Sequence, residues 1–174
     1  QANVQRPHGL LLLEPQKLTT LIIADLNLRT ARKERARIEY MVWHWLRQQN
    51  LFDHIDILTG IGVPIALYGN GWQGSKFEKL CLGPGGPKEL PQVYRKHSAV
   101  LTPANNLLLH PRVLETFAAG GCSIQQYNPG LEGLGVEQYL TRGALEGMGL
   151  RVLADETWRQ KLIAEGNRQV REQH

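Results

Sequence analysis

Short apolar segments alternate with helical segments along most of this 174-residue chain, and this alternation restricts the fold more than any other feature. A short apolar run bounded by turn residues is typical of a strand buried on both faces of a parallel sheet. The runs that fit this description span residues 18–25, 63–68, 77–82, 99–102 and 122–124. Strands that alternate with helices predict a parallel sheet with helices on both faces. The sequence therefore predicts an α/β, Rossmann-like domain.

Helical periodicity begins near Thr30. Ile38, Met41 and Trp45 belong to one apolar helical stripe, and basic residues occupy the opposite side. Residues 51–60 are ambiguous and fit a second short helix. Further helices are expected after the turn at residues 83–87 and through Tyr94, at residues 111–119 and at residues 157–172, and no strand is expected beyond residue 126.

The chain divides into a linker and one domain. Residues 1–16 are interpreted as a linker from a missing upstream region, because Pro7, Gly9 and Pro15 interrupt a stretch without periodicity and the chain begins with Gln. Residues 17–174 are long enough to bury a core without disulfides.

The composition excludes several classes of protein. Hydrophobic residues make up 42% and charged residues 21% of the chain, and no apolar run approaches the roughly 18–20 residues of a membrane span. A net charge of +4 favours a small anionic ligand, but it is too scattered for nucleic acid. Cys81 and Cys122 lie among apolar residues, which fits buried thiols in the cytoplasm. The histidines are dispersed and no Asp-x-Asp pair occurs, so neither a metal nor another cofactor is expected.

The segment from His110 to Gly121 carries the most chemical information. Proline at position 111 fits the first turn of a helix, whose start presents backbone N–H groups and a partial positive charge to a phosphate. Arg112 in this turn is placed to add a forked contact to phosphate oxygens. Glu115, on the same face, is placed to accept hydrogen bonds from two adjacent ribose hydroxyls. The alternative is a solvated ion pair between Arg112 and Glu115 without any ligand.

Together with its neighbours, this segment resembles the signature of family-1-type glycosyltransferases of the GT-B fold, most closely the spore-maturation-protein-like branch. In that family a strand ending in Gly-x-Gly-Trp precedes a Leu-x-x-Val-Tyr helix, a strand and an Arg-x-x-Glu-x-x-Ala-x-Gly helix. The matching residues are Gly69, Gly71 and Trp72, then Leu90, Val93 and Tyr94, then Arg112, Glu115, Ala118 and Gly120. The tail around Trp158 and Val170 is similar to the family's closing helix. The match extends over most of the chain from about Lys17, and the order of the motifs makes it specific.

The resemblance implies the C-terminal, donor-binding half of a glycosyltransferase that takes a sugar from a nucleotide diphosphate-sugar, with uridine the commonest base in related enzymes. Glu115 would hold the ribose, and Arg112 or the helix start would meet the diphosphate without an obligatory metal. Gly69, Gly71 and Trp72 would line the same cleft, although Trp72 fits a core anchor equally well.

The remaining candidates flank the helix. Asn105 and Asn106 would touch the base or sugar unless they only form a turn. His110 is interpreted as a helix-entry residue in preference to a phosphate donor. Gly120 and Gly121 permit a tight exit from the helix and a close approach of the backbone.

The chain also departs from the family's pattern. Retaining members often carry a second glutamate eight positions before the ribose-binding one, and Leu107 stands there instead. The acceptor domain, from which inverting members usually draw the general base, is expected to lie in the missing N-terminal region, so no catalytic residue is named. A degenerate, non-catalytic scaffolding module is the alternative function. A nicotinamide-dependent oxidoreductase is disfavoured because no Gly-x-Gly-x-x-Gly turn follows the first predicted strand.

Overall fold

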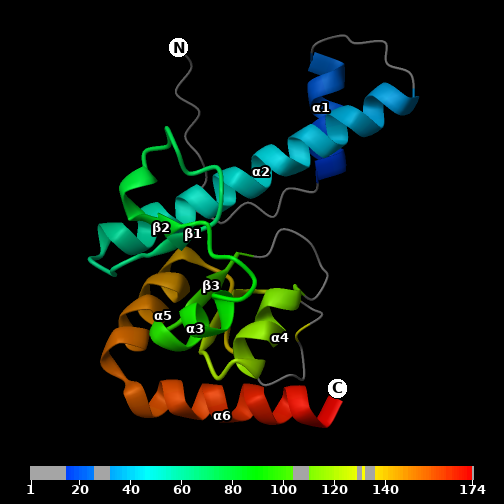
Figure 1. Ribbon diagram of the computed structural model, residues 1–174. Coiled ribbons are helices and arrows are strands. Elements are labelled where there is room, and N and C mark those ends of the chain that lie inside the picture. The colour runs from blue at the N-terminus through cyan, green and yellow to red at the C-terminus, as the bar shows by residue number, and fades with distance from the viewer. Residues whose placement is uncertain (1–14, 26–31, 104–109, 129–130, 132–135, 174) are drawn as a thin grey trace.

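The computed structural model describes residues 15–25, 32–103, 110–128, 131 and 136–173. Within these residues the elements run from two N-terminal helices through short strands and further helices to a long C-terminal helix (Figure 1). Asn105, Asn106 and Leu107, and most of the predicted linker, lie outside the described residues.

The N-terminal part of the domain is helical. α1 spans Pro15–Asp25 and packs against α2, which spans Arg32–Gly60 without a break (Figure 1). Arg35 Nη2 donates to Thr20 Oγ1 across this contact over 2.8 Å. The predicted strand at residues 18–25 is therefore wrong, because a short apolar run fits a helix as well as a buried strand. Residues 51–60 are the end of α2 and not a separate helix.

Five short strands in the described residues form two parallel ladders. β1 (Leu67–Tyr68) pairs with β2 (Cys81–Gly83). In the second ladder β4 (Ser123–Gln126) lies between β3 (Val100–Thr102) and β5 (Gln138–Tyr139). Parallel strands flanked by helices confirm the predicted α/β, Rossmann-like class.

The strands differ in extent from the prediction. The segment at residues 63–68 is paired only over its last two residues, and Pro64 has no N–H to contribute to a ladder. The run at residues 77–82 begins with a 3₁₀ turn, η1 (Glu78–Leu80), before β2 starts. β5 lies beyond residue 126, where no strand is expected, and its Gln138 is in register with Gln125 of β4.

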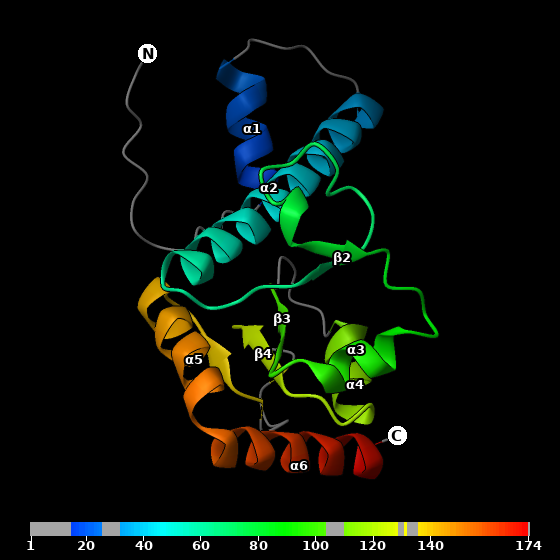
Figure 2. The same ribbon diagram turned by 60° about the vertical axis from the view of Figure 1, so that its left-hand side comes forward.

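Helices cover both sides of the three-stranded ladder. α3 (Leu90–Lys96) and α4 (Pro111–Ala118) lie on one side, α5 (Arg142–Ala154) lies on the other, and α6 (Glu156–Gln173) runs along one end (Figure 2). The sequence analysis missed α5, which contains three glycines. Its N-terminus is capped by Thr141, whose Oγ1 accepts the N–H of Ala144 over 3.2 Å.

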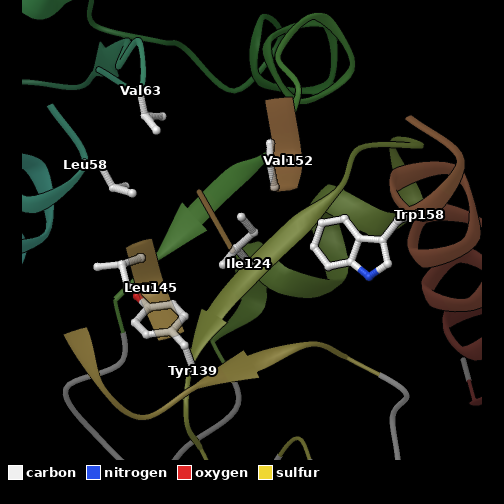
Figure 3. Packing of buried hydrophobic residues seen from close by; sticks show 7 residues of the cluster. All are labelled: Leu58, Val63, Ile124, Tyr139, Leu145, Val152 and Trp158. Carbon is white, nitrogen blue, oxygen red and sulfur yellow. The ribbon is translucent and has the colours of Figure 1, made fainter. Parts of the chain in front are cut away.

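The main core lies between this ladder and α5 (Figure 3). Ile124 of β4 and Tyr139 of β5 pack with Leu145 and Val152 of α5, while Trp158 closes the cluster from α6. Leu58 of α2 and Val63 reach the same cluster, so the end of α2 is fixed to the sheet.

A second contact fixes α4 against α6. Gly166 lies so close to Phe117 that a Cβ atom on this glycine would sit 2.2 Å from Phe117 Cδ1. Asn167 Nδ2 also donates to the backbone oxygen of Phe117 over 2.9 Å. The position of α4, whose first turn carries Arg112, therefore depends on α6.

Candidate functional site

A cavity of about 510 Å³ runs along residues 63–69 and 97–103, the segments that contain β1 and β3. Tyr68 and Thr102, the last residues of these strands, line it together with Gly69 and Pro103. Its interior is mostly aliphatic, and Arg47, His97, His110 and Arg112 add polar groups. Arg47, His110 and Arg112 lie close enough for both arginine charges to act on the imidazole, and these three residues form the polar end of the cavity. Ligands of open α/β sheets bind outside the carboxyl ends of the strands, so the part of the cavity beside Tyr68 and Thr102 lies where such a fold places a ligand.

His110 caps the first turn of α4. Pro111 has no N–H, the N–H of Arg112 donates to His110 Nδ1 over 3.2 Å, and the N–H of Val113 donates to the backbone oxygen of His110 over 3.0 Å. The expectation that this helix start leaves free N–H groups for a phosphate is therefore wrong. Because Nδ1 accepts a hydrogen bond, the proton of the neutral ring is on Nε2. The interpretation of His110 as a helix-entry residue fits this geometry.

Two guanidinium groups act on His110. Burial lowers the pKa of His110 most, the charges of Arg112 and Arg47 lower it further, and Glu115 opposes them. Histidine with a lowered pKa stays neutral at physiological pH, so its Nε2–H remains a donor while the two arginines supply the positive charge. The sequence analysis missed Arg47.

Tyr94 holds Glu115 beside Arg112. The Tyr94 hydroxyl donates to Glu115 Oε2 over 3.3 Å, and only 4% of Tyr94 is exposed. Burial raises the pKa of Tyr94 most, Arg112 lowers it and Glu115 raises it, so both charged groups face this ring. No ion pair joins Arg112 to Glu115 in the part of the chain that the structure describes. The alternative of a simple ion pair between them is therefore not supported.

The comparison with protein families decides the class of this chain. A family model described as "Glycosyl transferase-like" matches residues 47–174. The chain belongs to this glycosyl transferase-like family. Comparisons with curated proteins and with solved structures find no match. The family supports a glycosyl transfer function, and its matched region contains the whole polar end of the cavity.

The loop after β1 brings part of the predicted motif to this cavity. Gly69 and Trp72 line it, whereas Gly71 is exposed and is not part of the wall. Gly69 has a φ of +119°, a conformation that favours glycine, and its N–H donates to Gly83 O over 2.9 Å. Trp72 also packs on Phe52 with ring centroids 6.4 Å apart. Trp72 is thus both a core contact and a wall residue.

The two glycines after α4 lie away from the cavity. Gly120 and Gly121 follow the C-terminus of α4, about 12 Å along the helix from His110. A Cβ atom on Gly121 would sit 2.6 Å from the backbone oxygen of Tyr94, so this glycine permits close packing of the turn against α3. The structure does not bring either glycine to the cavity.

One weak feature of the sequence could have identified Arg47 as a candidate residue. It follows Trp43 by four residues, the spacing of neighbours on one helix face, and its guanidinium carbon lies 5.7 Å from the Trp43 ring centroid. Apolar periodicity along a helix does not identify such a cation.

Two features do not occur among the residues that the structure describes. No cluster of three or more His, Cys, Asp and Glu side chains that could hold a metal ion occurs among them. Nor does any helix in these ranges have the length and apolarity needed to cross a bilayer.

Proposed function

We propose that this domain binds the nucleotide diphosphate-sugar donor of a glycosyl transfer reaction at the polar end of the cavity. The observation that carries the proposal is the pair of Arg112 and His110 on the cavity wall, with Glu115 one helical turn further along α4 and outside that wall. Arg112 and the Nε2–H of His110 contact the diphosphate. The Glu115 carboxylate, oriented by Tyr94, accepts hydrogen bonds from the ribose hydroxyls.

These groups would act on the reaction by electrostatic stabilisation. Negative charge develops on the nucleotide diphosphate as the bond to the sugar breaks, and fixed positive groups stabilise that charge. Side chains supply this stabilisation, because the first-turn N–H groups of α4 are already engaged. The partial positive charge at the start of α4 adds to it. No metal is required in this proposal.

The proposal extends to the type of enzyme. The order of the motifs from Gly69 to Gly120 favours the C-terminal half of a hexosyltransferase of the GT-B type, close to the spore-maturation-protein-like branch and acting in the cytoplasm. The acceptor and the general base then belong to a separate N-terminal domain, and UDP is the first nucleotide to test. Nucleic acid is not among the proposed partners.

Calorimetric titration with UDP, GDP, ADP, dTDP and NAD tests the proposal. We expect one nucleoside diphosphate to bind, and Glu115→Ala to weaken this binding by about 1.5–3 kcal/mol, the range for hydrogen bonds to a charged group. Glu156→Ala, which removes an exposed carboxylate at the start of α6, is the matched control and should leave affinity unchanged. Failure of every nucleotide to bind contradicts the proposal and favours the scaffolding alternative.

A further inference from the structure

Arg47 reaches the polar end of the cavity from an element outside the strand–helix repeat. It lies on α2, lines the same cavity as Arg112 and His110, and its guanidinium group lies over Trp43. Arg112 approaches from the first turn of α4. The two guanidinium groups thus come from different elements, and the His110 ring senses both charges.

The charges at this end of the cavity are not balanced within the protein. Arg47 forms no ion pair with a carboxylate in the described ranges, and Glu115, held by Tyr94, is the acidic group that acts on His110. Arg47 and Arg112 are exposed, so water screens their repulsion in the free protein, and an anion between them interacts favourably with both charges. A ligand with two adjacent phosphates satisfies both, because a guanidinium group binds phosphate oxygens through paired N–H donors.

We propose that Arg47 is the second phosphate-binding cation of the donor site, so that the diphosphate lies between Arg47 on α2 and Arg112 on α4. This inference rests on the proposed donor-binding function, and it adds that the site is specific for a diphosphate. The site discriminates a diphosphate from a monophosphate, because only a diphosphate engages both guanidinium groups. The cavity volume of about 510 Å³ falls within the range of small-molecule sites.

Calorimetric titration of Arg47→Met tests this inference. The probes are the nucleoside diphosphate that binds the wild-type protein best, its monophosphate and inorganic pyrophosphate. We expect Arg47→Met to lower the affinity for the two diphosphate probes by about tenfold or more, and the affinity for the monophosphate by much less. Arg47→Lys keeps the charge without the fork and should fall between wild type and Arg47→Met.

A matched variant controls for general charge. Arg37→Met removes an exposed cation from the same helix outside the cavity wall, and it should bind all three probes as wild type does. Equal diphosphate affinity in wild type and Arg47→Met overturns the inference and leaves the proposed function intact. Equal weakening of the diphosphate and monophosphate probes also overturns the discrimination. Absence of binding by the wild-type protein overturns the proposed function and this inference together.

Discussion

The backbone N–H of Arg112 donates to Nδ1 of His110 over 3.2 Å, and this bond decides how α4 meets an anion. It occupies a first-turn donor that would otherwise bind a phosphate directly. It also fixes the ring tautomer, so that Nε2–H is the available donor of His110. The helix start thus acts through its side chains and its partial charge, not through free backbone N–H groups.

Removal of this cap should destabilise the domain. In His110→Ala the N–H of Arg112 loses its acceptor, and we expect the free energy of unfolding to fall by about 0.5–2 kcal/mol, as for other N-cap losses. His110→Asn supplies a better N-cap and should restore stability. Urea unfolding of the three proteins measures the effect, and equal stability of His110→Ala and wild type would contradict the capping role.

The hydrogen bond from Tyr94 should orient the Glu115 carboxylate. Tyr94→Phe removes only the hydroxyl, and we expect it to weaken nucleotide binding by about 0.5–1.5 kcal/mol. The same substitution in a Glu115→Ala background should have no further effect, because the hydroxyl acts through that carboxylate. A calorimetric double-mutant cycle tests this, and additive losses would show that Tyr94 acts independently of Glu115.

Gly166 should resist replacement by alanine although it lies inside a helix. Alanine improves helix propensity by about 1 kcal/mol, but its Cβ would sit 2.2 Å from Phe117 Cδ1, and overpacking costs about 1–3 kcal/mol. We expect Gly166→Ala to be destabilised on balance. Gly147→Ala on α5, where no atom lies within 4 Å of the added Cβ, is the control and should be stabilised. Thermal unfolding distinguishes the two, and a Gly166→Ala variant as stable as Gly147→Ala would contradict the close packing.

His54 should make the domain less stable in mild acid. Burial lowers its pKa below the ordinary value of 6.5, against the raising effects of its hydrogen bond to Asn50 and the charge of Asp53. As the pH falls below about 6.5, His54 takes up a proton in the unfolded chain but not in the folded protein. The free energy of unfolding therefore decreases until the pH reaches the pKa of folded His54.

Urea unfolding of wild type and His54→Gln between pH 7 and pH 5 measures this slope. The variant should show a shallower decline, while His97 and His110, whose pKa values are also lowered, maintain part of it. Identical slopes in the two proteins would count against His54.

The sequence predicts the part of the fold in which local signals agree. α4 carries a proline at its first position and an exit at Gly120, and its bounds differ from the prediction by one residue. α1 and α5 lack such agreement. The apolar run at Leu21 and Ile22 fits a helix as well as a strand. Helix α5 was not predicted, because its glycines lower the helix propensity of the segment.

The site could be predicted only where one segment of sequence carries it. Arg112 and Glu115 are three residues apart, so their shared position follows from helical spacing. Arg47 is 65 positions before Arg112 and meets it only because the end of α2 packs on the core at Leu58. The hydrogen bond from the Arg112 N–H to His110 depends on the rotamer of His110, and the periodicity of the sequence does not predict a rotamer.

Hydrogen exchange measured with and without the best-binding nucleoside diphosphate tests whether the donor binds in this cavity. We expect added protection in three segments that contribute to the cavity wall: residues 44–51 of α2, the loop at residues 69–72, and residues 110–118 of α4. α6 should exchange as in the free protein, apart from its contact with Phe117. Protection confined to other segments, or no protection at saturating nucleotide, would contradict the assignment of the donor site to this cavity.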